Sequence, residues 1–348
     1  MIPPHVYIAA TGMVTPVGLN TIATRAAISA GVSAYADSVC QNRKFESMRM
    51  ALIPDEALPA LNADLLQLNL NCRQQRLLRI ATPALRQVVD QVPLKTPPPL
   101  FLALPESIPG CKFAPHPGFL NALEIQTGIK FNCAESRIFN SGRAGGIEAI
   151  QAAFNYFSIS GNSIALVGGL DTYLDLLLLA VLDKDERVLA NEASNAFAPG
   201  EAGGFLLLTV ENVVQYLPNP PRAILYPPGL ATEPGHRYSD QPCLGDGLAN
   251  AFGISIKNAS GPSINTIYTT LNGEHFGSKE LGVAYTRNQR NFDKQIKIEH
   301  PADCIGDIGA AFGPISIGLA TVNNTGNVAL HACSSEKEKR AAVITRII

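Results

Sequence analysis

The chain alternates short, uninterrupted apolar runs with segments whose apolar residues recur at helical spacing. The apolar runs predict buried strands, because a strand covered by helices on both faces carries apolar residues on both sides. Predicted strands lie at residues 5–10, 100–104, 163–167, 203–210, 222–225, 264–270, 327–332 and 340–347. Predicted helices lie at residues 21–30, 71–92, 145–157, 174–182, 246–252 and 309–320. This alternation predicts the α/β fold class.

Local signals refine these elements. Thr11-Gly12 predicts a tight turn directly after the first strand. The helix at residues 174–182 is apolar except for Asp175 and is predicted to be buried. The helix at residues 71–92 has one apolar face, and three arginines are predicted on its opposite side: Arg73, Arg76 and Arg79. Pro-rich loops between residues 218 and 229 suggest an N-terminal half, residues 1–215, and a C-terminal half, residues 216–348.

Composition excludes several classes of protein. Of the 348 residues, 46% are hydrophobic and 16% are charged, which excludes a disordered chain. The net charge of -2 gives no support for nucleic-acid binding, which needs a basic face. The longest apolar run, Leu176 to Leu182, has seven residues, whereas a spanning helix needs about 20. The N-terminus has no basic segment ahead of an apolar one, so we expect no signal peptide, no membrane span and a cytoplasmic protein.

The cysteines predict reduced thiols and no metal site. Seven cysteines are scattered along the chain, and no CxxC pair occurs. Cys133 and Cys304 could each be a nucleophile, but a small buried hydrophobe is the favoured interpretation. A group with helical spacing around residues 300–307 resembles a ligand set, but Pro301 and Gly306 argue against a helix there. Phosphate-loop, dinucleotide-binding and zinc-protease motifs are missing, so no cofactor is expected.

Four stretches, taken in order, resemble the β-ketoacyl synthases of the thiolase-like superfamily. They are VYIAATGMVTPVGLNTIATRAAISAGVSAY at residues 6–35, IALVGGLDTYLD at 164–175, FAPGEAGGFLLL at 197–208 and GDIGAAFG at 306–313. The resemblance implies a layered αβαβα fold with two mixed five-stranded sheets from a duplicated half, and a dimer. It also implies decarboxylative condensation of acyl thioesters by a Cys at the tip of a buried helix, with two His and backbone amides stabilising the charge that develops.

The residues that carry this chemistry in the family are replaced here. Aligned through Ala149-Ile150, the position of the family Cys is Arg143, which cannot act as a nucleophile because its guanidinium stays protonated. Ser141 is the nearby hydroxyl, and no His is close to it in sequence. The second His position is Gly306, beside Asp307.

Two further segments depart from the family pattern. The first His position is near Thr269, and His275 follows several residues too late to take its role. The C-terminal glycine loop, whose backbone shapes the oxyanion hole in the family, is replaced by the charged segment at residues 333–340. We expect this segment to be the solvated tip of a hairpin.

Polar residues nevertheless remain at the expected pocket. The candidates are Arg143, Ser141, Asn272, Glu274, His275 and Asp307. Three interpretations remain open. Arg143 forms an ion pair with Glu274 or Asp307 that fills the space left by substrate, or it binds a carboxylate or phosphate ligand, or the site is rewired for catalysis.

The favoured function is that of a ketosynthase-like protein that has lost condensing activity and acts as a partner or accessory, comparable to a chain-length factor. The alternatives are an active acyltransferase or 3-oxoacyl synthase with a rewired site, and an adaptor for bacterial secretion effectors. Expected partners are a second copy or a ketosynthase-like subunit, and an acyl carrier protein of fatty acid or polyketide biosynthesis.

Overall fold

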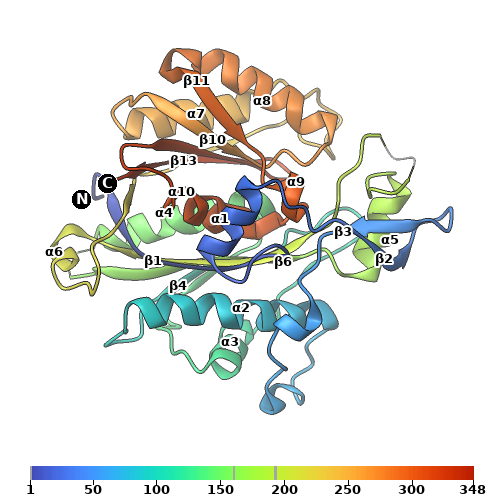
Figure 1. The fold of residues 1–348 in the computed structure, drawn as a ribbon, viewed down its shortest axis with the longest axis horizontal. Helices are drawn as coiled ribbons and strands as arrows, with labels where there is room; N and C mark the ends of the chain where they lie inside the picture. Colours follow the sequence, from blue (N-terminus) through green and yellow to red (C-terminus); the bar gives the residue numbers. More distant parts are fainter. Residues whose placement is uncertain (1, 160, 192–193) are drawn as a thin grey trace.

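Figure 1 shows the chain as five layers in the order helices, sheet, helices, sheet, helices. The computed structural model describes residues 2–159, 161–191 and 194–348. The strands are β1 Val6–Val14, β2 Ala36–Gln41, β3 Ser47–Met50, β4 Leu100–Ala103, β5 Arg137–Phe139, β6 Ile164–Thr172, β7 Glu201–Thr209, β8 Ala223–Leu225, β9 Gly229–Thr232, β10 Ile264–Thr269, β11 Phe292–Glu299, β12 Val328–Ser334 and β13 Lys339–Ile347. The α-helices are α1 Thr21–Ser29, α2 Cys72–Gln91, α3 Phe119–Thr127, α4 Gly145–Phe157, α5 Leu176–Lys184, α6 Glu211–Val214, α7 Asp246–Asn258, α8 His275–Asn288, α9 Ala302–Ile305 and α10 Phe312–Ala320. Short 3-10 turns include η3 Gly142–Ala144 and η5 Gly309–Ala311.

The strands form two mixed five-stranded sets, as the resemblance implies. The first set has the order β1-β7-β6-β4-β5, and the second has the order β11-β10-β12-β13-β8, with β9 also paired to β13. β8 is antiparallel to both β13 and β1, so it joins the two sets along one continuous hydrogen-bonded path. Strands β5 and β11 therefore form the outer edges of this path.

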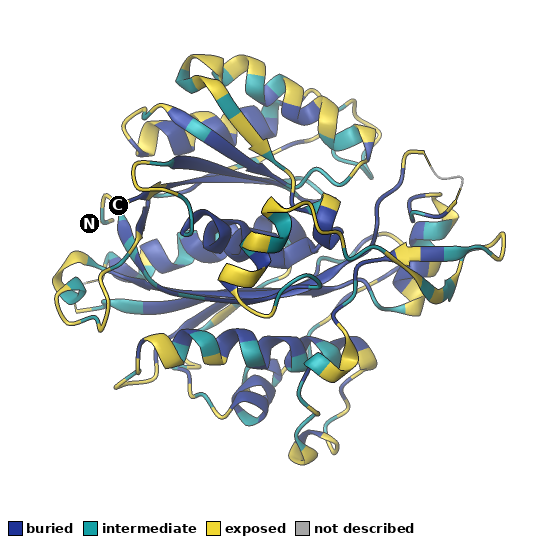
Figure 2. Cartoon of the chain, in the orientation of Figure 1, coloured by how far each residue is buried: buried dark blue, intermediate teal, exposed yellow. Residues whose placement is uncertain are grey.

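Helices α4 and α10 lie between the two sets of strands, where all nine residues of α10 and eight of the 13 residues of α4 are buried (Figure 2). They approach each other through glycine: a Cβ on Gly146 would lie 2.6 Å from Pro314 Cδ and 3.2 Å from Gly313 Cα. Residues larger than glycine would force these helices apart, because two atoms cannot approach so closely. The close packing fixes η3 and η5, the turns that precede the two helices.

The outer layers cover the remaining sheet faces. α2 packs on β1, β7 and β6, and α7 packs on β9 and β13 (Figure 1). α2 begins with a capping box, in which Asn71 and Gln74 satisfy each other's backbone amides. No helix in the described ranges is both long enough and apolar enough to cross a membrane. The division of the chain at residues 215 and 216 stays a prediction.

The predicted α/β class is confirmed, and several local expectations are corrected. Thr11-Gly12 does not turn, because β1 runs through it to Val14 and pairs with β7. α5 is only partly buried, with Leu176 and Leu177 exposed. Arg73 is buried rather than on the outer side of α2, because it pairs with the buried Asp171 at 3.1 Å.

The expectations for the two candidate cysteines and for the segment near residue 300 hold only in part. Cys304 is buried as expected, whereas Cys133 is exposed and so is not a core residue. Pro301 precedes the one-turn helix α9 instead of preventing a helix, because proline is tolerated at a helix N-terminus. The sequence reading did not predict β2, β3, α3, β5, β9, α8 and β11, whose polar or mixed patterns are weak signals.

Candidate functional site

Arg143 occupies the turn at the start of the buried helix α4, where the resemblance places the nucleophile. It lies in η3, and its side chain is 7% exposed. The turn depends on Gly142, which has a φ of 59° and packs against Glu106. A Cβ at Gly142 would also lie 2.4 Å from Glu106 Oε1. Both the positive φ and this close contact therefore exclude a side chain at this position.

Asp307 is the first partner of Arg143. Arg143 Nε donates to both carboxylate oxygens of Asp307, at 3.2 and 3.1 Å, and Nη2 also donates to Oδ2. The backbone N–H of Gly309 donates to Asp307 Oδ1 at 2.9 Å, and the side-chain amide of Asn272 donates to Oδ2 at 2.8 Å. The carboxylate is 5% exposed and every contact stabilises its charged form.

Glu336 is the second partner of Arg143, and its position corrects the expectation of a solvated hairpin tip. It lies between β12 and β13 and is 7% exposed. Arg143 Nη1 donates to Glu336 Oε1 at 2.8 Å. Glu336 points inward onto arginines that are remote in the sequence, so these charges neutralise one another instead of facing water, whereas Lys337, Glu338 and Lys339 are partly exposed.

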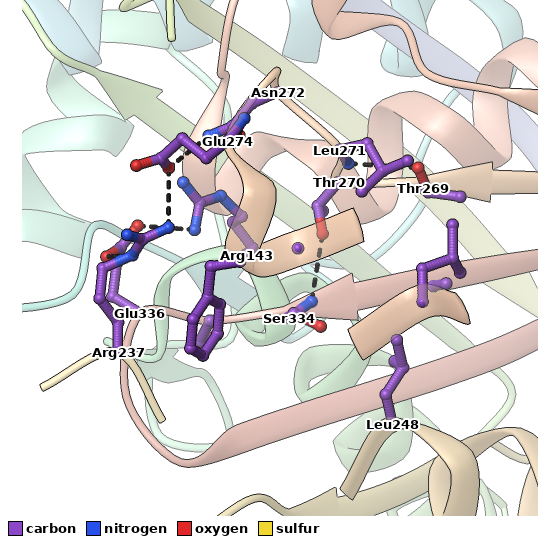
Figure 3. Close-up of a pocket in the computed structure, with 15 residues that line it drawn as sticks. Arg143, Arg237, Leu248, Thr269, Thr270, Leu271, Asn272, Glu274, Ser334 and Glu336 are labelled. Atoms are coloured by element: carbon purple, nitrogen blue, oxygen red, sulfur yellow. Dashed lines mark hydrogen bonds and ion pairs between the residues drawn. The ribbon is translucent and has the colours of Figure 1, made fainter. Parts of the chain in front are cut away.

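Two further arginines surround the same carboxylates (Figure 3 shows Arg237 beside Glu336). Arg187 binds Glu274 through Nε at 2.7 Å and Nη2 at 2.9 Å, and it binds Glu336 at 2.8 and 2.9 Å. Arg237 lies 3.1 Å from Glu274 and 3.3 Å from Glu336. We call Arg143, Arg187, Arg237, Glu274, Asp307 and Glu336 the ion-pair cluster. Its formal charges sum to zero, so its members compensate one another without a ligand.

The electrostatics of the cluster follow from this pairing. Burial by itself raises the pKa of Glu336, but Arg143 and Arg187 outweigh burial and hold the pKa well below its ordinary value. Burial likewise opposes the charge of Arg143, but Asp307, Tyr173 and Glu336 together outweigh burial and raise the pKa of Arg143 well above its ordinary value. Glu106 is not a member of the ion-pair cluster. Burial, and then the charge of Glu336, raise its pKa to about 8.

Backbone amides around the cluster are already occupied. The N–H of Ala144 donates to Ser335 Oγ at 2.9 Å, and the N–H groups of Glu336 and Lys337 donate to Glu106 at 2.8 and 3.4 Å. An oxyanion hole needs backbone donors that point at the reacting oxygen. Here these donors are bound to side chains of the protein itself.

Little space is left beside Arg143. The side chain lines two cavities of about 30 Å³ each, one toward Thr270 and Phe276 and one toward Glu106 and Tyr173. Sites for small molecules usually have about 300–1,000 Å³, whereas these cavities have room for about one water molecule each. A larger polar cavity of about 710 Å³ lies outside the cluster, where Arg187 and Arg237 form part of its wall.

The other sequence candidates lie at different distances from this centre. Asn272 bridges the cluster by donating to both Glu274 and Asp307. Ser141 lies at the start of η3, where its carbonyl accepts from Ser335 Oγ. His275 is exposed at the start of α8, and its backbone N–H donates to Asn195 rather than to a cluster member.

The sequence reading missed Arg187, Arg237 and Glu106, and misplaced Glu336. Arg187 and Arg237 lie in irregular segments without a periodic pattern. The density of charge at residues 333–340 was a visible signal, but its interpretation required the positions of the opposite charges.

The comparisons agree with this architecture. No family model matches the chain, and no curated protein sequence matches it. Among solved structures, a ketosynthase in complex with its chain length factor from Xenorhabdus doucetiae matches with a TM-score of 0.78 and 15% identity, covering 99% of this chain and 98% of that chain. The ishigamide ketosynthase/chain length factor matches with a TM-score of 0.75 and 15% identity, covering 99% of each chain.

A third similar structure comes from a larger enzyme. The ketosynthase from module 6 of the bacillaene synthase from Bacillus subtilis 168 matches with a TM-score of 0.75 and 13% identity, covering 99% of this chain and 72% of that chain. Together with the five layers, these similarities define a thiolase-like fold. Within that class, the chain has the ketosynthase fold, which confirms the resemblance seen in the sequence.

Proposed function

We propose that this protein is a ketosynthase-like accessory protein that has lost condensing chemistry and acts beside an active partner, as a chain-length factor does. The observation that carries the proposal is Arg143 at the nucleophile position, buried and bound to Asp307 and Glu336. A guanidinium cannot attack a thioester, and this one is committed to two carboxylates. The site thus contains a structural ion-pair network in place of a nucleophile and its activating groups.

The surroundings of Arg143 support the same proposal. Condensation needs a nucleophile, donors for an oxyanion and room for an acyl chain. The nearby backbone donors are bound to Ser335 and Glu106, and the cavities beside Arg143 have about 30 Å³ each. A rewired acyltransferase that uses Ser141 would need a base, and His275, which is exposed at the start of α8, makes no hydrogen bond to Ser141 among the described residues. No contact in the described residues favours the adaptor interpretation.

The proposed partners follow from the fold. The protein pairs with a second copy of itself or with a ketosynthase-like subunit, and an acyl carrier protein visits the assembly in the cytoplasm during polyketide or fatty acid synthesis. Support comes from the similar structures, two of which contain a ketosynthase with a chain length factor. Another similar structure is described as a type II acyl-carrier protein in complex with its ketosynthase.

The proposal is tested with a chloroacetyl thioester probe that alkylates ketosynthase nucleophiles. The experiment uses the Cys72→Ser/Cys133→Ser variant, because both thiols are exposed and would react without any site. We expect peptide mass spectrometry to find no modified residue around Arg143, while an active ketosynthase treated in parallel is labelled stoichiometrically. Stoichiometric labelling of Ser141 or of a cysteine beside the cluster would instead establish a rewired acyltransferase.

A further inference from the structure

A second group of buried polar side chains lies on the C-terminal half, beside the loop at residues 233–245 that joins β9 to α7. Glu233 begins this loop, Cys243 lies near its end and Glu280 lies on α8. The two carboxylates and the thiol each offer one atom, and these three atoms lie within 4.8 Å of one another. Both glutamates are 1% exposed, whereas Cys243 is partly exposed.

One oxygen in this group has no partner. Glu280 Oε1 accepts from Arg340 Nε, but Oε2 is buried and has no hydrogen-bond partner among the described residues. An unsatisfied buried carboxylate oxygen is costly, since it has lost its water and gained no donor. Arg340 Nη2, in the same ion pair, is likewise buried without a hydrogen-bond partner among the described residues. Oε2 thus offers its lone pairs to a cation that binds beside Cys243 and Glu233.

The remaining carboxylate oxygens are held in place as metal ligands usually are. Glu233 Oε2 accepts from the backbone N–H of Gly247 at 2.9 Å, and Oε1 accepts from that of Leu244 at 3.4 Å. Arg340 Nε likewise donates to Glu280 Oε1 and orients that carboxylate. Such outer contacts orient ligands and leave the other lone pairs free for the metal.

The charge of the group also calls for a cation. Glu280 pairs with Arg340, which is itself 1% exposed, and Glu233 has no ion pair among the described residues. With both carboxylates ionised and the Cys243 thiol neutral, these three side chains and Arg340 carry one net negative charge. A divalent ion that displaces the thiol proton would balance two carboxylates and one thiolate together with Arg340, which leaves the group neutral.

We propose that Glu233, Cys243 and Glu280 bind a zinc ion, with water as the fourth ligand at the exposed side of Cys243. The mixed set of one sulfur and two oxygens suits zinc, whereas magnesium and calcium prefer oxygen ligands alone. Zinc ligands in a tetrahedron lie about 3.5 Å apart, so binding would draw the three atoms inward by about 1 Å. The sequence pattern predicted no zinc site because no CxxC pair occurs.

This zinc site would stabilise two segments that carry the ion-pair cluster. The loop between Glu233 and Cys243 contains Arg237, so a metal at both ends of the loop restrains that arginine. Arg340 Nη1 donates to the carbonyls of Ser335 and Lys337 on either side of Glu336, at 3.0 and 2.5 Å. Zinc binding at Glu280 thus connects through Arg340 to the hairpin that supplies Glu336.

The test measures metal binding to the full chain without an affinity tag. Metal-free protein is titrated with Co²⁺, a spectroscopic substitute for zinc, and zinc content is measured after growth in zinc-supplemented medium. We expect about one zinc per chain and a thiolate-to-cobalt absorption band in the near ultraviolet. Cys243→Ser should abolish the band and weaken binding at least about tenfold.

Matched variants separate this site from general thiol binding. Cys40→Ser changes a cysteine of similar exposure in β2 and should leave the band and the zinc content unchanged. Glu233→Gln keeps the size of the side chain and should weaken metal binding. The proposal is overturned if saturating Co²⁺ produces no thiolate band, or if Cys243→Ser and Cys40→Ser bind metal equally well.

Discussion

At the scale of single residues, Arg143 and Asp307 determine what the site can do. The resemblance to ketosynthases places Arg143 at the nucleophile position and Asp307 beside a catalytic His position. In this protein the two residues carry opposite charges and lie within hydrogen-bonding distance. A buried pair contributes little net stability compared with apolar residues, but breaking it leaves an uncompensated charge and is costly. This asymmetry gives a direct test of a structural role.

Replacing Arg143 with Met should destabilise the fold by about 3–5 kcal/mol, because Asp307 loses its counter-charge while Glu336 retains Arg187 and Arg237. Adding Asp307→Asn should recover much of this loss, since no stranded carboxylate then remains at that position. Adding Glu274→Gln is the matched control and should give no recovery, because Glu274 pairs with Arg187 and Arg237 instead. Urea denaturation of the single and double variants measures these differences.

A different result for Arg143→Met would assign Arg143 a different role. Side chains retained for binding or catalysis often reduce stability. If Arg143→Met were as stable as the wild type, the ion pair would not be structural, and Arg143 would become a candidate ligand-binding residue.

At the scale of elements, the two outer strands differ in how they avoid association. β11 is long and carries alternating charges, including Lys294, Lys297 and Glu299, which is a common protection of an exposed sheet edge. β5 has only three residues and a single charge at Arg137, and Ile138 and Phe139 are partly buried against the core. We expect β5, the edge with fewer charges, to be the one that pairs with another copy or with a ketosynthase-like subunit.

The prediction for β5 compares two isoleucines on opposite edges of the sheet. Analytical ultracentrifugation of the wild type at micromolar concentration should show a dimer, of twice 37.0 kDa. Ile138→Lys should shift the protein toward monomer, because a lysine in the paired edge loses its hydration. Ile298→Lys on β11 should remain dimeric. A wild-type monomer that recovers no ketosynthase-like partner from its own cells would contradict the proposed assembly.

At the scale of the whole molecule, two buried groups with shifted pKa values shape the pH dependence of stability. Burial and the nearby Glu336 raise the pKa of Glu106 from 4.5 to about 8. Burial lowers the pKa of His331 from 6.5 to about 3, where the ring lies between the hydroxyls of Ser316 and Thr345. Each shift corresponds to on the order of 5 kcal/mol.

The two groups act in opposite directions. Between pH 4.5 and 8, the folded state keeps a proton on Glu106 that the unfolded chain releases, so stability falls as pH rises. Between pH 6.5 and 3, the unfolded chain takes up a proton on His331 that the folded state excludes, so stability falls as pH drops. The contributions of these two groups oppose each other between pH 4.5 and 6.5.

Urea denaturation across this pH range checks the assignment. Glu106→Gln should remove most of the loss of stability above about pH 6.5 while leaving the loss at acid pH unchanged. His331→Gln should flatten the acid side instead. If Glu106→Gln and the wild type lose stability equally on the alkaline side, the Glu106 carboxyl is already charged at neutral pH in the folded protein.

The sequence by itself determined the class of fold, because its signals are local. Helix α4 at Gly145–Phe157 was predicted at its observed bounds from small and apolar residues at helical spacing, and the glycine-rich turns marked the resemblance to ketosynthases. It also led to the prediction that Arg143 stands at the position of the family nucleophile. Only the tertiary structure decided the partners of Arg143 and the burial of Glu336, and only it brings Cys243 to two glutamates. A charged turn is stable either when water solvates it or when opposite charges surround it. Glu336 is buried because the fold brings Arg143, Arg187 and Arg237 to it from remote segments of the chain.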